Sequence, residues 1–140
     1  LITVGSALGV GHAMAESGAA EVVAGQVVAL VEPYGRTALL VTLYALTAAL
    51  AGTVYTATSA ALMFPIAASV AEAQGIALLP MTLMIMVAAS TAFSTPVGYA
   101  ANLMVYGPGG YRYTDFLRLG LPLQVIVGTT SIVILQWLFL

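Results

Sequence analysis

The sequence has very few charged side chains, no cysteine and no lysine. Its 140 residues include three Arg, five acids and one His, so 6% of the chain is charged, against about 25% in a soluble domain. The absence of cysteine excludes disulfides and thiolate metal centres. One His among scattered acids does not supply a metal cluster, and a net charge of −2 without a basic patch argues against nucleic acid as a partner.

What the chain does contain is a long apolar region. Glu72 is the one charged residue between positions 37 and 111, 61% of the chain is hydrophobic, and the mean hydropathy is +1.08. A water-soluble domain needs charge on its outward faces. The composition therefore predicts an all-α transmembrane protein with several spans in the cell (plasma or inner) membrane, surrounded by the lipid bilayer.

The first part of the chain predicts two helices of different kinds. Residues Leu1–Ala15 are short for a span of about 20 residues and indicate the end of a helix that begins upstream, so we expect a fragment of a longer protein. Ala19–Glu32 mixes apolar and acidic residues, which is typical of a helix near the interface or packed on protein. Pro33–Arg36 predicts a turn at a membrane boundary, and His12 a packed or boundary residue.

The charge-free region from 37 to 71 has a polar patch near its middle. A straight helix of these 35 residues would measure about 52 Å, more than the roughly 30 Å of the hydrocarbon core. We expect a bend at Gly52 and the patch Thr53–Ser59, with about 15 residues in Thr37–Ala51 and about 11 in Ala60–Val70. Neither half is long enough to cross alone, which favours a re-entrant hairpin with a polar tip; one bent crossing helix is the alternative.

The second charge-free region contains a helix-breaking patch. Ile76–Phe93 predicts an apolar helix whose methionines are packing residues. Pro96 removes a backbone donor and Gly98 permits unusual dihedral angles, so a break is expected over Ser94–Tyr99. Ala100–Tyr106 then predicts a short helix beyond the break. This pattern is typical of a discontinuous transmembrane helix, and a purely structural proline kink is the alternative.

The other polar segments predict turns and membrane boundaries. Glu72–Gly75 and Gly107–Gly110 indicate turns by composition. Tyr111–Arg118 combines aromatic and basic residues and predicts an interfacial segment, in which Thr114 could cap a short helix. Gly120–Leu140 is a final apolar span of about the right length.

Two segments resemble a known family. The first is Ala61-Leu-Met-Phe-Pro-Ile-Ala-Ala-Ser-Val-Ala-Glu72. The second is Thr95-Pro-Val-Gly-Tyr-Ala-Ala-Asn-Leu-Met-Val-Tyr-Gly-Pro-Gly-Gly-Tyr-Arg112, continued by Phe116–Pro122. Both resemble the divalent anion/sodium symporter family, the permeases for dicarboxylates, citrate and sulfate, in its bacterial branch. The resemblance covers essentially the whole chain.

The resemblance implies a fold with two inverted repeats, each with a re-entrant hairpin and a discontinuous helix. Residues 1–140 would form a single membrane domain, which is one repeat from the C-terminal half of an inverted-repeat secondary transporter core. The implied partners are the missing N-terminal half of the same protein, a small anionic substrate and a second copy in a homodimer.

The resemblance also implies a set of site residues from the hairpin tip and from the break. Hydroxyl groups are present at the tip, and no Asn. The implied substrate-binding residues are Thr56, Ala57, Thr58, Tyr99, Ala100 and Asn102. The implied ion-binding residues are Tyr55, Thr56, Pro96, Val97 and Gly98. Na⁺ is the implied coupling ion, without any other metal or cofactor. For Asn102 the alternative role is that of a helix cap.

Together these features predict an ion-coupled secondary transporter that moves a small anion (dicarboxylate, citrate or sulfate) and is driven by Na⁺. The sequence has no acid, base or nucleophile constellation, so we do not expect an enzyme. Backbone carbonyls, hydroxyls and helix N-termini suit a carboxylate or sulfate together with a small cation. The alternative is a membrane-embedded structural or energy-coupling subunit with no transport site of its own.

Overall fold

The computed structural model describes residues 5–6, 9–10, 12–13, 16–31 and 35–139, and these residues contain helices, turns and loops but no strand. The all-α prediction is thus confirmed for this part of the chain. The helices are α2 (Ala19–Val31), α3 (Gly35–Thr53), α4 (Thr56–Gln74), α5 (Leu78–Ser90), α6 (Ala100–Tyr106) and α7 (Tyr113–Phe139).

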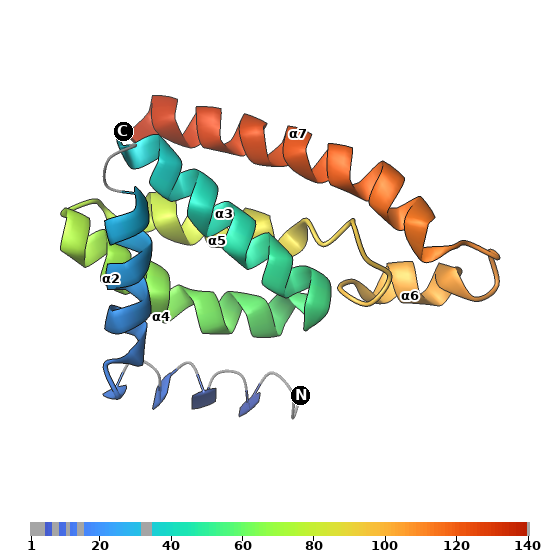
Figure 1. Cartoon of the computed structure of the whole chain (residues 1–140), viewed down its shortest axis with the longest axis horizontal. Helices are drawn as coiled ribbons and strands as arrows, with labels where there is room; N and C mark the ends of the chain where they lie inside the picture. The colour runs from blue at the N-terminus through green and yellow to red at the C-terminus, as the bar shows by residue number, and fades with distance from the viewer. Residues whose placement is uncertain (1–4, 7–8, 11, 14–15, 32–34, 140) are drawn as a thin grey trace.

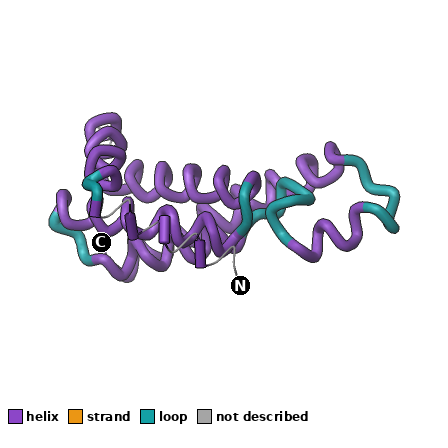
Figure 2. The backbone as a smooth tube through the Cα atoms, turned by 90° about the horizontal axis from the view of Figure 1, so that it is seen from below, coloured by secondary structure: helices purple, strands orange, loops and turns teal. Residues whose placement is uncertain are grey.

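The helices form an elongated bundle with one projecting end. In Figure 1, α3 and α4 run in opposite directions as a hairpin, α5 returns beside them, and α2 crosses the open end of the hairpin. Helix α6 lies beyond the closed end of the hairpin, and α7 runs back along the whole bundle. Figure 2 shows α6, its loops and the start of α7 projecting from the rest of the bundle.

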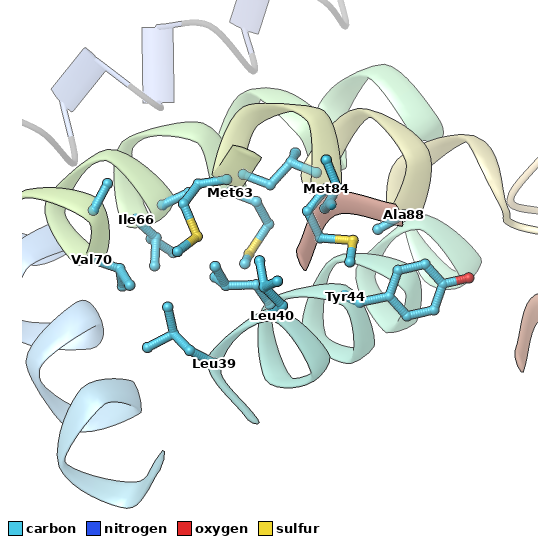
Figure 3. Close-up of a cluster of buried hydrophobic side chains, with 14 of the residues drawn as sticks. Leu39, Leu40, Tyr44, Met63, Ile66, Val70, Met84 and Ala88 are labelled. Carbon is cyan, nitrogen blue, oxygen red and sulfur yellow. The ribbon is translucent and has the colours of Figure 1, made fainter. Parts of the chain in front are cut away.

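The core lies between α3, α4 and α5. Figure 3 shows Leu40 of α3, Met63 and Val70 of α4, and Met84 of α5 pointing toward one another, and each is at most 2% exposed. Close packing supplies dispersion contacts that lipid cannot replace, since lipid tails are as apolar as the side chains. The packing role expected for the methionines is confirmed for Met84, whereas Met86 is 59% exposed.

The bend within the charge-free region from 37 to 71 is shorter than its polar patch predicts. Only Val54 and Tyr55 separate α3 from α4, and each helix has 19 residues. The hydroxyl of Thr53 donates to the Leu50 carbonyl at 3.0 Å within its own helix, so it does not interrupt the helix. Both helices are long and apolar enough to cross a membrane. The prediction that each half is too short to cross is therefore wrong, and so is the single bent helix, because the chain reverses.

Two further predicted boundaries are also wrong. The interfacial segment and the last span form one helix, α7, because the Asp115 carboxylate accepts the backbone N–H of Arg112 at 2.8 Å and starts the helix there. Thr114 lies inside α7 and is not its cap. Glu72 belongs to the last turn of α4 and is not part of the turn after it.

The N-terminal predictions are tested only in part. Much of Leu1–Ala15, together with Pro33 and Tyr34 of the predicted turn, lies outside the described residues. His12 is exposed and lies 3.4 Å from Glu16 one helical turn later, so it is not packed against the described helices.

Gly75 ends α4 in a left-handed conformation with φ +61°. Its N–H donates to Glu72 and that of Ile76 donates to Ala71, which together form a Schellman motif. Gly75→Ala is expected to lower the stability by about 1 kcal/mol, because a Cβ disfavours this conformation. Thermal unfolding of the detergent-solubilised complete protein measures the change. Gly107→Ala is the control, since Gly107 has φ −72° and open space around it; equal effects of both variants would refute this explanation.

Candidate functional site

The closed end of the α3–α4 hairpin presents the start of α4. Tyr55 has extended backbone (φ −165°, ψ 148°) and precedes α4 without a side-chain hydrogen bond that caps the helix. The Ser59 N–H donates to the Tyr55 carbonyl at 2.9 Å and closes the first turn. The earlier N–H groups of this turn have no partner within the helix. The hairpin therefore ends in a positive helix terminus that carries unused donors.

The break after α5 is longer than predicted. The helix ends at Ser90, and Thr91 follows it with its hydroxyl donating to the Ala88 carbonyl at 2.9 Å. The chain is irregular up to Tyr99, which precedes α6 and does not cap it with its side chain. The predicted short helix Ala100–Tyr106 is confirmed at both ends. The discontinuous helix expected from Pro96 and Gly98 is thus present.

Hydrogen bonds join the hairpin tip to the break. The Thr56 hydroxyl donates to the Gly98 carbonyl at 3.2 Å, and the Thr95 hydroxyl donates to the Gly52 carbonyl at 2.7 Å. The Gly98 N–H in turn donates to the Thr95 hydroxyl oxygen at 3.2 Å. The tip and the break are far apart in the sequence, so the fold brings the two predicted halves of the site into direct contact.

Gly98 permits a close approach between the two halves. A Cβ at this position would collide with the Ala51 carbonyl oxygen, lie 2.9 Å from the Ala92 Cβ and lie 3.1 Å from the Gly52 Cα. Gly98 is not among the residues with positive φ. The sequence-based reason for this glycine, unusual dihedral angles, is therefore wrong, and the reason in the structure is lack of space.

The Asn102 side chain lies within the first turn of α6 and reaches back to the break. Its amide nitrogen donates to the Ala92 carbonyl at 3.3 Å and to the Thr95 carbonyl at 3.1 Å. These bonds satisfy backbone acceptors that the broken helix leaves free. Asn102 does not precede α6, so it is not its N-cap, and its contacts are those of a brace across the break. Its role in binding stays a prediction.

Two hydroxyls of the hairpin tip are buried without a partner. Thr58 is 9% exposed and Ser59 is 0% exposed, and neither hydroxyl oxygen has a hydrogen bond within the described chain. A buried polar group without a partner costs roughly 1–3 kcal/mol. Such groups are candidates for contact with a bound ion, a water molecule or another part of the complete protein.

The other predicted site residues differ in burial. Tyr55 is 42% exposed, Val97 54% and Tyr99 47%. Ala57 is partly buried, Pro96 is buried and Ala100 is exposed. Apolar residues can contribute only backbone atoms to an ion or a polar substrate, so hydroxyl and backbone groups would have to form the site.

Sequence reasoning missed one residue that holds the site together, Thr95. The Thr95 hydroxyl bridges the Gly52 carbonyl and the Gly98 N–H, and a Cβ added at Gly52 would make only an ordinary van der Waals contact of 3.4 Å with the Thr95 methyl carbon. Ser94 lies near Gly52 as well. The signal was present in the sequence as two short hydroxyl-rich segments, one beside a glycine and one beside a proline.

Cavities lie on both sides of the break. One of about 670 Å³ lies between α6, the following loop and α7, and its lining includes Asn102, Tyr111 and Asp115. Another of about 490 Å³ lies between α3 and α7, with Gly52 and Thr95 among its lining residues. The contact between tip and break is therefore not enclosed by the described helices.

These features define a class of protein. Within the described residues, α3, α4 and α7 are each long and apolar enough to cross a membrane. A multi-pass helical membrane protein with a broken helix against a hairpin tip is the architecture expected of a transporter core. The chain belongs to the citrate transporter family, whose model matches it over residues 1–140.

Several relatives are longer transporters. An uncharacterized transporter of Synechocystis sp. is 47% identical over 90 residues, which cover 64% of this chain and 15% of that protein. The uncharacterized transporter YfbS of Escherichia coli is 37% identical over 106 residues, or 76% of this chain and 17% of the relative. Sodium/sulfate cotransporter 1 of Chlamydomonas reinhardtii is 34% identical over 125 residues, which cover 89% of this chain and 14% of that protein. The chain thus spans less than a fifth of each of these relatives.

Proposed function

We propose that the chain supplies one half of the binding site of a Na⁺-coupled transporter for a small anion such as sulfate, citrate or a dicarboxylate. The observation that carries this proposal is the hydrogen bond from Thr56 to the Gly98 carbonyl, which joins the tip to the break. The other half of the site belongs to the rest of the complete protein, which functions as a homodimer. Sodium/sulfate cotransporters among the relatives support Na⁺ and an oxyanion as the ligands.

The chemistry of the two segments suits both ligands. Backbone carbonyls of the break and the hydroxyls of Thr56 and Thr58 are hard oxygen donors that suit a small cation. The uncapped start of α4 directs N–H groups and the positive end of its dipole outward, which suits carboxylate or sulfate. The tip and the break carry no side-chain charge, so the cation would help to neutralise the anion in a medium of low polarity.

Although α3 and α4 are each long enough to cross a membrane, we propose that their hairpin is re-entrant with its tip inside the membrane, because the tip contacts the break after α5. Helix α5, the break and α6 follow one another in the same general direction, and α6 continues beyond the hairpin tip (Figure 1). With about 20 Å in α5 and about 10 Å in α6, this discontinuous unit is about as long as the hydrocarbon core is thick, so a tip beside its break would lie inside the membrane. Irregular backbone at that depth is tolerated where it is buried in protein or lines a polar cavity.

Thr56→Val in the complete protein tests this function. The variant keeps the shape of the side chain but loses its hydroxyl, so Na⁺-driven uptake of labelled sulfate or citrate into proteoliposomes is expected to fall about tenfold. Thr56→Ser keeps the hydroxyl and is expected to retain most of the uptake. Val and Ser variants with equal, wild-type uptake would contradict the proposed site, and no Na⁺-dependent uptake of any tested anion by the wild type would contradict the function.

A further inference from the structure

Tyr44 connects three elements outside the proposed site. It is 8% exposed in α3, and its hydroxyl donates to the Gln124 carbonyl of α7 at 2.6 Å. The same hydroxyl oxygen lies 3.0 Å from the hydroxyl of Thr91, which directly follows α5. Because the Tyr44 proton goes to Gln124, Thr91 is the donor in this contact and shares its proton between the Tyr44 oxygen and the Ala88 carbonyl. Figure 3 shows the Tyr44 ring at the edge of the core with its oxygen pointing away from the apolar cluster. A single phenol therefore links α3 and α7 to the start of the break.

Two glycines of α7 allow this helix to lie close to Tyr44 and to the break. A Cβ at Gly128 would lie 2.7 Å from the Tyr44 Cζ, so the ring rests directly on the α7 backbone. A Cβ at Gly120 would lie 2.7 Å from the Ser94 Cα, so the same helix also rests on the backbone of the break. Gly120, Gln124 and Gly128 are four residues apart and share one face of α7. This face holds the Tyr44 ring and the break at the same time.

The break is attached to α3 at two points. The Tyr44 hydroxyl contacts Thr91, and the Gly52 carbonyl accepts from Thr95 at 2.7 Å. The first contact lies at the start of the break and the second lies four residues later, so the segment between them is held against α3 at both ends. It cannot move along α3 by a helical turn unless these contacts are released.

We propose that Tyr44 is a positioning residue for the proposed ion site, and this inference rests on the proposed function. Its hydroxyl fixes the start of the break on α3 and α7, and the Thr95 attachment then sets the position of the Gly98 carbonyl opposite Thr56. Oxygen ligands that are held in place before an ion arrives bind it more tightly than ligands that must first be ordered. Loss of the hydroxyl therefore weakens Na⁺ binding without removing any ligand.

The test uses Tyr44→Phe in the complete protein, because the ring stays on Gly128 and only the hydroxyl is lost. Uptake of labelled sulfate, citrate or succinate into proteoliposomes is measured against Na⁺ concentration. The half-saturating Na⁺ concentration is expected to rise about fivefold to tenfold. Thr91→Val is expected to give a similar rise, and the double variant less than the sum of the two, since both variants break the contact between these two hydroxyls.

The matched control is Thr42→Val, which removes a hydroxyl of α3 that donates to the Ala38 carbonyl of the same helix. It is expected to leave the Na⁺ dependence unchanged. A merely structural role of Tyr44 would lower the amount of protein in the membrane or its unfolding temperature at an unchanged half-saturating Na⁺ concentration, and this result would overturn the inference. If the Tyr44→Phe protein does not accumulate in the membrane, the half-saturating Na⁺ concentration of Thr91→Val tests the inference instead.

The positioning role and the proposed function would fail in different ways. Wild-type Na⁺ dependence in both Tyr44→Phe and Thr91→Val would overturn the positioning role and leave the proposed function intact. If uptake by the wild type does not depend on Na⁺, both the proposed function and the positioning role are overturned.

Discussion

Gly98→Ala in the complete protein is expected to reduce transport by about 100-fold or more. The added Cβ would meet the Ala51 carbonyl oxygen and the Ala92 methyl carbon, so the break must move away from the end of α3. Such overpacking costs typically about 1–3 kcal/mol, and the displaced Gly98 carbonyl would lose its hydrogen bond to Thr56. Initial rates of anion uptake at saturating Na⁺, normalised to the amount of protein in the membrane, measure this effect.

The control for this variant is Gly25→Ala. Gly25 lies in α2, and nothing lies within 4 Å of the position where its Cβ would be. Alanine is the better helix former there, by roughly 1 kcal/mol, so this variant is expected to be as active as the wild type and at least as stable. Wild-type transport by Gly98→Ala would show that the tip and the break need not be in close contact, and would contradict the site.

Asn102→Leu has the second largest expected effect. Leucine is branched at the same carbon but is larger and has no donor, so the Ala92 and Thr95 carbonyls lose their bonds to the amide at 3.3 and 3.1 Å. Unpaired backbone carbonyls in a membrane protein cost roughly 1–3 kcal/mol each. We expect α6 to lose its fixed position relative to the break and uptake to fall by about 10-fold to 100-fold.

Thermal unfolding separates the two roles of Asn102. A brace predicts a lower unfolding temperature even without ligand, whereas a residue that only binds substrate would leave it unchanged. Thr130→Val serves as the control, because the Thr130 hydroxyl is exposed and donates to the Ile126 carbonyl within its own helix. Uptake and stability of Asn102→Leu equal to those of this control would refute both roles.

The sequence predicted the places where regular structure fails better than it predicted the helix lengths. The break and the short helix that follows were predictable from Pro96 together with Gly98 and the neighbouring hydroxyl residues. A proline alone was not sufficient, because Pro65 and Pro122 lie inside α4 and α7. Thr53 was misleading because threonine hydroxyls can bond within their own helix as well as interrupt it. The start of α7 depends on one contact between Asp115 and the Arg112 backbone, which composition alone did not distinguish from a separate interfacial segment.

The candidate site was predictable as two segments but not as a set of contacts. Hydroxyl-rich patches near Gly52 and Pro96 marked both segments, and the resemblance to the transporter family paired them. The contact of Thr56 with Gly98 and the bridge through Thr95 depend on how two hairpins of chain meet in space, for which one sequence has no local signal. Tyr44 was hidden for the same reason, because its partners lie 47 and 80 positions away.

The most direct test of the central claim is ligand binding by the complete protein. Its thermal unfolding is followed with sulfate, citrate and succinate, each with and without Na⁺. We predict that one anion raises the unfolding temperature only when Na⁺ is present, since about 100-fold excess over the dissociation constant stabilises by about 2.7 kcal/mol, and that Gly98→Ala abolishes the rise. Stabilisation by the anion that needs no Na⁺ and persists in Gly98→Ala would contradict the proposed site.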